Sequence, residues 1–219
     1  MGVVVALLAA LLAAVIPASA SWAQTDEGMH LQRFTQSDFY KGVINRAIAT
    51  VPPAVFQKCP SLVSTGSRVT VLKPVSFGQS GFPNAGLWKQ SFPISGCGND
   101  TVLNFYFSAS ADEKINTVIG IPGTTHADLT LGRDTLLYAN MGAALIAKDC
   151  KSFVVKNTKF EGFGHAKAPI ADPGPGKSPA PWWETWTMIG CDRTVDVPIE
   201  YAPDATGTQI TQPGGAVAR

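Results

Sequence analysis

Charged residues are scarce in this chain of 219 residues. Only 15% of its residues are Asp, Glu, Lys or Arg, and the formal net charge is +1. Proteins that bind nucleic acid through its phosphates need a basic stripe, and the sequence has none, so nucleic acid is not an expected partner. The chain has four cysteines, no Cys-x-x-Cys pair, and none of its three histidines beside a cysteine. This spacing argues against a metal site, and we expect neither a metal nor a cofactor.

A long apolar run occurs once, over residues 3–16, and residues 1–23 contain no charged side chain. Pro17 ends the run, and small residues follow it. This pattern predicts a secretory signal peptide over 1–23, with cleavage after Ala20 or Ala23. The alternative is an uncleaved anchor, but the run is shorter than the roughly 20 residues that span a bilayer. We therefore expect a periplasmic or secreted protein without a transmembrane anchor.

The remaining chain contains the same order of features twice. Each half begins with Thr-x-x-Asp, at Thr35 and at Thr125, which predicts a helix N-cap followed by an amphipathic helix. Each half then runs through a cysteine, a strand, a Pro/Gly-rich loop, a tryptophan strand, a Gly-Cys turn and two more strands. The alternative is that the two halves resemble each other by chance, because short β segments have similar compositions. The predicted helical stripes are Phe39, Val43, Ile44, Ala47 and Ile48 in the first half, and Leu137, Met141, Ala144 and Leu145 in the second.

This order predicts an α+β fold of two tandem pseudo-repeats, each with one helix packed on an antiparallel sheet of about four strands. After the signal peptide we expect an N-terminal segment over 24–34, the first repeat over 35–123, the second repeat over 124–214, and a flexible tail over 215–219. A small domain buries little surface, so we expect the two halves to pack together.

The four cysteines indicate two disulfides, since an even number in an exported chain is typical of a disulfide framework. Four cysteines allow three pairings, and the duplication selects one of them. Cys59 pairs with Cys97, and Cys150 pairs with Cys191. The two separations are 38 (97 − 59) and 41 (191 − 150) residues, which are nearly equal, as a duplication requires.

No group of residues forms a recognisable catalytic constellation. His126, with Asp128 or Asp134 nearby, could act as a general base in a small periplasmic enzyme, a hydrolase or isomerase. The alternative is a surface histidine in a helix cap, because nothing adjacent resembles a nucleophile. The sequence assigns no catalytic residue and favours a non-enzymatic role.

The second half carries a candidate binding surface beside a Pro/Gly-rich loop over 171–181, which is longer than its counterpart in the first half. Alternate residues of a strand share one face, so one face packs the core and the other exposes aromatic side chains. Exposed aromatic residues are enriched in binding hot spots, so we predict contact with another envelope protein. The alternative is that all three tryptophans are buried. The predicted binding residues are Trp182, Glu184, Trp186 and Met188; Trp183, Thr185, Thr187 and Ile189 share the other face.

The carboxy-terminal region resembles a group of small secreted proteobacterial proteins of unknown function. The likeness rests on W-x-E-x-W-T from Trp182, the cysteine at 191, V-P-I-x-Y over 197–201, and I-P-G-T-T-H-A-D over 121–128. It implies export and a disulfide-bonded domain, and it implies no known activity. Asp192 follows the last cysteine where that group often has Gly, so the turn there is expected to differ.

A fainter likeness links the chain to the carboxy-terminal domain of TonB-type proteins. There, a strand pair such as 103–107 and 114–121 precedes a helix such as 134–147. This is a likeness of fold, which carries no functional implication by itself.

Overall fold

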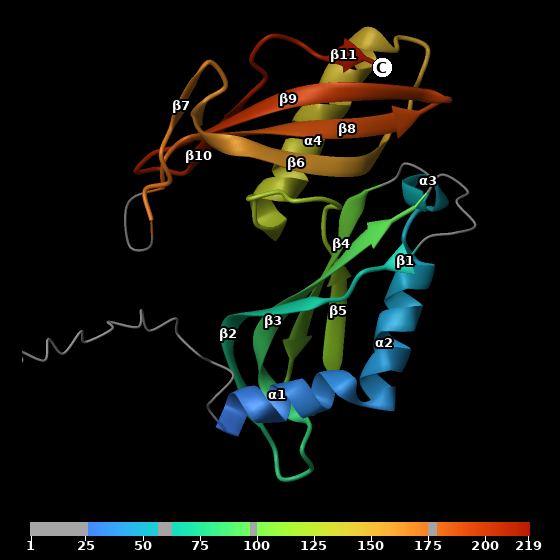
Figure 1. Cartoon of the computed structure of the whole chain (residues 1–219), viewed down its shortest axis with the longest axis vertical. Coiled ribbons are helices and arrows are strands. Elements are labelled where there is room, and N and C mark those ends of the chain that lie inside the picture. Colours follow the sequence, from blue (N-terminus) through green and yellow to red (C-terminus); the bar gives the residue numbers. More distant parts are fainter. Residues whose placement is uncertain (1–25, 57–62, 97–99, 175–178) are drawn as a thin grey trace, which may run out of the picture.

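The computed structural model describes residues 26–56, 63–96, 100–174 and 179–219 (Figure 1). The predicted signal peptide and the predicted Cys59–Cys97 disulfide lie outside the described residues.

The described chain is a mixture of α and β structure in which antiparallel strands dominate. Figure 1 shows two sheets placed one above the other along the longest axis of the molecule. The helices are α1 (Asp26–Gln36), α2 (Asp38–Ala49), α3 (Pro53–Phe56) and α4 (Leu129–Ile146). The first sheet contains β1 (Val63–Ser64), β2 (Arg68–Phe77), β3 (Pro83–Ser95), β4 (Thr101–Ala109) and β5 (Ile115–Ile119). The second contains β6 (Val154–His165), β7 (Ala168–Ile170), β8 (Trp182–Gly190), β9 (Arg193–Pro203), β10 (Thr208–Thr211) and β11 (Val217–Ala218).

The α+β class is confirmed, but the arrangement is less regular than one helix on four strands in each half. The described part of the first half has three helices and that of the second has one, and the sheets have five and six strands. Residues 217–218, within the expected tail, pair with β9. The Arg219 side chain also forms an ion pair of 2.5 Å with Asp196.

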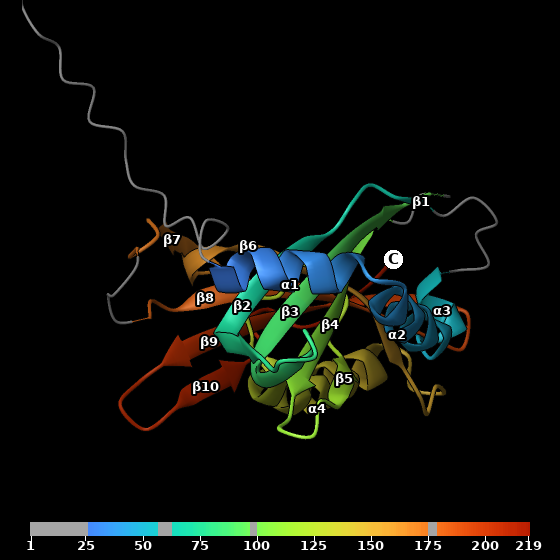
Figure 2. The ribbon, with the colours of Figure 1, turned by 90° about the horizontal axis from the view of Figure 1, so that it is seen from below.

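The core of the first half lies between α1, α2 and one face of the first sheet. Figure 2 shows α1 lying across the strands of this sheet. Trp88 of β3 stacks on Phe107 of β4 with their ring centroids 5.6 Å apart, and its indole N–H donates to the Tyr40 hydroxyl at 3.0 Å. Burial raises the pKa of Tyr40, because the charged phenolate would lose its hydration there. The hydrogen bond therefore fixes α2 against β3.

The helix caps differ from the predicted threonines. Ser37 caps α2 and Asp128 caps α4, each accepting a backbone N–H of the first turn. Thr35 lies in the last turn of α1. Thr125 is not a cap of α4, because its hydroxyl accepts the N–H of Ala127, which lies before the helix, and donates to the carboxylate of Glu184.

The predicted apolar stripe of α4 does not face the core. Leu137, Met141 and Leu145 are 64%, 58% and 71% exposed. In α2, by contrast, Val43, Ile44 and Ala47 are buried as predicted. The reason is the close approach of α4 to β9, because a Cβ added at Gly142 would lie 2.8 Å from Val197 Cγ1. Only small side chains fit such a contact, and the buried residues of α4 are Gly132, Thr135, Ala139, Gly142 and Ala143.

The predicted Cys150–Cys191 disulfide is confirmed, with 5.7 Å between the two Cα atoms. It joins the chain after α4 to the hairpin between β8 and β9. Gly190 pairs with Arg193 across this hairpin, and the two turn residues have positive φ, 49° at Cys191 and 58° at Asp192. A two-residue turn of this kind favours Gly or Asn. Asp192 is a less favourable choice than Gly, but a tolerated one, since short polar side chains visit this region.

The segment of residues 120–128, here called the linker, joins the two halves. The N–H of Gly123 donates to the carbonyl of Val102 in β4 at 2.7 Å. On its other side the linker forms two backbone hydrogen bonds with Thr158 of β6. The N–H of Thr158 donates to the carbonyl of Pro122 at 2.9 Å, and the N–H of Thr124 donates to the carbonyl of Thr158 at 2.8 Å. The linker therefore binds both sheets at once.

Gly123 is the residue that permits this fit. Its φ is +106°, and an added Cβ would lie 2.1 Å from the carbonyl oxygen of Thr158. We expect Gly123→Ala to lower the free energy of unfolding by at least about 3 kcal/mol, since backbone strain of roughly 1–3 kcal/mol and a steric clash act together. Chemical denaturation followed by tryptophan fluorescence measures this.

Gly81→Ala is the matched control. Gly81 also has a positive φ, +81°, but an added Cβ meets nothing within 4 Å. It should therefore show the cost of backbone strain alone. Equal losses in the two variants would contradict the tight contact between the linker and β6.

Candidate functional site

A buried carboxylate stands at the centre of the second half. Glu184 of β8 is 0% exposed. Its Oε1 accepts from the backbone N–H of His126 at 2.7 Å and from the indole N–H of Trp182 at 3.1 Å. Its Oε2 accepts from the hydroxyl of Thr125 at 2.8 Å and from the indole N–H of Trp186 at 2.9 Å. These four donors match the roughly four acceptor positions of a carboxylate.

This arrangement follows from the W-x-E-x-W pattern. Alternate residues of a strand point to one side, so both indoles flank the carboxylate from positions two residues away. The remaining two donors come from the linker, about 60 residues earlier in the chain. Glu184 thus ties the linker to the second sheet.

The four predicted binding residues lie in the core. Trp182 is 5% exposed, and Glu184, Trp186 and Met188 are 0% exposed. Their face of β8 packs under α4 together with Val197, Ile199 and Tyr201 of β9. They do not form an exposed surface in this structure, and contact between them and a partner stays a prediction.

A groove of about 560 Å³ lies between the two halves, on the face of the first sheet that α1 and α2 leave uncovered. The linker forms its other wall. Asn104 of β4 fixes this wall, since its side-chain amide donates to the carbonyls of Ile121 and Gly123 at 2.9 Å each. The residues used below, all of which line the groove, are Arg68, Leu72, Lys89, Tyr106, His126 and Asp128.

Two cations line this groove. The Lys89 ammonium lies 5.7 Å from the centroid of the Tyr106 ring, and partial burial lowers the Lys89 pKa. Burial, and then the negative charge of Asp128, raise the pKa of Tyr106. In the part of the chain that the structure describes, neither Arg68 nor Lys89 forms an ion pair. The groove therefore offers two positive charges, unpaired within the described residues, beside an aromatic ring.

His126 stands between this groove and a second hollow. Its ring centroid lies 5.5 Å from those of Phe160, Phe163 and Trp182. The second hollow, of about 340 Å³, is bounded by Trp182 and by Pro173 and Pro179 of the Pro/Gly-rich loop. His126 is thus an accessible ring supported by three aromatic side chains.

The two acidic residues expected to act with His126 differ in position. The carboxylate of Asp128 lines the groove but accepts the N–H of Leu131 at 2.8 Å as the cap of α4. Asp134 lies on α4 and is not among the groove residues. His126 and Asp128 share the groove, while Asp134 does not take part in it.

The described residues contain no group of three or more His, Cys, Asp or Glu side chains that could hold a metal ion. Within the same residues, no helix combines the length and apolar character needed to cross a membrane.

Comparison of the chain with known protein families, with curated proteins and with solved structures gives no match. The resemblance to small secreted proteobacterial proteins and the fainter likeness to TonB-type domains therefore stay predictions.

The groove residues of the first sheet were not among the predicted site residues, although the sequence contains one signal for them. Along β3, Lys89 and Ser91 share one face, whereas Trp88 and Phe92 share the other. Such alternation marks a sheet with one uncovered face. The joining of that face to the linker depends on contacts distant in sequence, and no local pattern indicates it.

Glu184→Gln is expected to lower the free energy of unfolding by about 3 kcal/mol, because the amide nitrogen would face a donor and leave a buried group unsatisfied. Denaturant unfolding measures the change, and the exposed Glu27→Gln on α1 is the matched control. A loss no larger than that of the control would show that the hydrogen bonds from Thr125 and His126 to Glu184 do not hold the linker.

Proposed function

We propose that this chain is an exported, disulfide-stabilised binding or accessory module of the cell envelope and not an enzyme. Export is supported by the predicted signal peptide and by the Cys150–Cys191 disulfide, since disulfides persist in oxidising compartments. The observation that carries the binding role is the groove between the halves, with two cations that form no ion pair among the residues the structure describes.

We also propose that residues 35–123 and 124–214 are tandem copies of one module. Two stacked cross-strand aromatic pairs support this: Trp88 with Phe107, and Trp182 with Tyr201. Both members of the second pair lie 94 residues after those of the first (182 − 88 and 201 − 107). The main strands also pair in the same order, β2-β3-β4-β5 and β6-β8-β9-β10.

The ligand that suits the groove is an acidic segment of another envelope protein. Arg68 and Lys89 would each gain a carboxylate partner, and such charge-assisted bonds are stronger than neutral ones. Tyr106 and Leu72 add apolar contact area to the same wall. The hollow beside the Pro/Gly-rich loop continues this surface past His126. The loop contributes there through Pro173 and Pro179, and the largely buried Trp182 also bounds the hollow.

The double variant Arg68→Gln/Lys89→Gln tests the proposal. We expect it to weaken binding of a labelled peptide of alternating Glu and Leu by about tenfold or more, since hydrogen bonds to charged groups contribute roughly 1.5–3 kcal/mol each. Fluorescence anisotropy measures this affinity. An envelope protein captured by the unaltered chain should be lost in the same variant.

Arg33→Gln/Lys151→Gln is the matched control, because it removes the same charge from exposed positions outside the groove. Equal binding by both double variants would overturn the groove as the site. A peptide of alternating Gln and Leu that binds as tightly as the acidic one would overturn the ligand class.

The second candidate is an envelope hydrolase or isomerase in which His126 acts with Asp128. It is favoured by one observation, that both residues line the same groove. His126→Gln separates the two functions. As a binding module, the protein has no turnover for this substitution to remove, and only its affinity for the acidic peptide can change, because His126 lines the groove. Loss of a turnover activity in this variant would instead establish the enzyme.

A further inference from the structure

The outer face of α4 carries an apolar stripe with no covering element among the described residues. Leu137, Met141 and Leu145 recur every four residues, which places them in one row along the helix. Tyr138 and Ile146 flank the row and are 39% and 40% exposed. Scattered exposed apolar residues are normal, but a contiguous row of this kind marks an interaction surface.

A rotation of α4 about its axis cannot bury this row against the second sheet. The opposite face of α4 meets β9 through Gly142, where even a methyl group would overlap Val197. Larger residues do not fit there, so the orientation of the helix is fixed by its small residues. The apolar stripe therefore faces away from the core of the second half.

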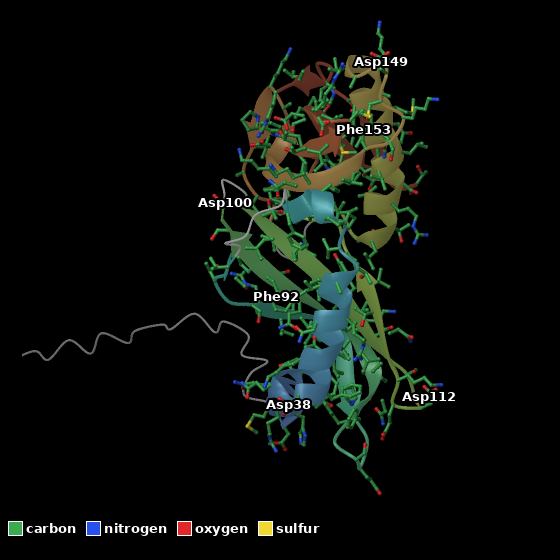
Figure 3. All side chains as sticks on the ribbon, turned by 90° about the vertical axis from the view of Figure 1, so that its right-hand side faces the viewer. Asp38, Phe92, Asp100, Asp112, Asp149 and Phe153 are labelled. Atoms are coloured by element: carbon green, nitrogen blue, oxygen red, sulfur yellow. A yellow bond between two sulfur atoms is a disulfide. The ribbon has the colours of Figure 1, made fainter. Side chains whose placement is uncertain are left out.

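Charged residues border the stripe at both ends. Arg133 and Asp134 precede it, Lys148 and Asp149 follow it, and all four are exposed. None of them takes part in an ion pair within the described residues. The Cys150–Cys191 disulfide holds the chain directly after Asp149, and Figure 3 shows Asp149 at the outer end of the second half.

The apolar residues and the charged residues lie at equal distances in sequence on either side of Met141, so that this surface is complementary to a second copy of itself. Leu137 and Leu145 lie four positions on either side of Met141, Asp134 and Lys148 lie seven, and Arg133 and Asp149 lie eight. An antiparallel second copy, related by a two-fold axis through Met141, would place Leu137 against Leu145. It would also bring Arg133 and Asp134 of one α4 close to Lys148 and Asp149, which lie in the turn that follows the other α4. Leucine would meet leucine, and each charged pair would bring together opposite charges. A two-fold interface needs a self-complementary surface of this kind.

We infer that the exposed face of α4 is the interface of a homodimer, in which two copies of the chain pair antiparallel about Met141. The charges argue against a membrane surface as the occupant. Arg133 and Lys148 balance Asp134 and Asp149, whereas helices that bind anionic lipid carry an excess of Lys and Arg beside the apolar face. A single helix pair is a small interface, so the dimer belongs to the weak class.

Sedimentation velocity of the full exported chain over a concentration series tests the inference. We expect a monomer–dimer equilibrium. Met141→Glu would place two like charges together at the axis and raise the dissociation constant by about tenfold or more, or about 1.4 kcal/mol. Met29→Glu is the matched control, because Met29 is an exposed methionine on another helix. It should leave the constant unchanged.

Two further measurements test the geometry. Asp134→Lys should weaken the dimer, and adding Lys148→Asp to it should restore the affinity. Under mild oxidation, Met141→Cys should cross-link to itself, whereas Leu137→Cys should cross-link to a Leu145→Cys chain and not to itself.

A chain that stays monomeric at all concentrations would overturn the inference. So would a dimer that Met141→Glu leaves intact, or a Leu137→Cys chain that cross-links to itself as well as Met141→Cys does. Flotation of the monomer with phosphatidylglycerol vesicles would assign the stripe to a membrane surface instead.

Discussion

The carboxylate of Glu184 is the group on which the joint between the two halves depends. It is buried, and two of its four hydrogen bonds go to the linker. A buried carboxylate that loses its donors costs several kcal/mol, so the linker has one favourable position. That position also forms one wall of the groove. The shape of the proposed binding surface is therefore set from within the core, by a carboxylate that does not itself line the groove.

The second constraint is the close approach of α4 to the second sheet. Small residues on one side of the helix allow this approach, and they leave its larger residues outside. A prediction from helix periodicity assumes that the larger apolar side chains face the core. This assumption fails in α4, because its backbone lies so close to β9 that only small side chains fit between them. One feature of the packing thus accounts for both the misassigned stripe and the apolar surface of α4.

The sequence allowed the α+β fold class and the Cys150–Cys191 pair to be predicted, because each leaves a local pattern or a spacing. Alternation along β8 also placed Trp182, Glu184, Trp186 and Met188 on one face. It did not show whether that face is covered, since coverage depends on α4, more than 30 residues away. The groove was not predicted for the same reason. Arg68, Lys89 and His126 come from separate segments, and only tertiary contacts bring them together.

The proposed duplication gives a physical account of how the joint arose. Counting two residues on from the paired tryptophans, the equivalent of Glu184 is Gln90 in the first half. Both side chains are buried, but Gln90 donates to Ser67 within its own half and its carbonyl oxygen has no partner among the described residues. A carboxylate has only acceptors, so Glu at this position must collect N–H and O–H groups from elsewhere, and the linker supplies two of them. A single change from amide to carboxylate, in one copy only, would then convert an internal contact into a tie between the two modules.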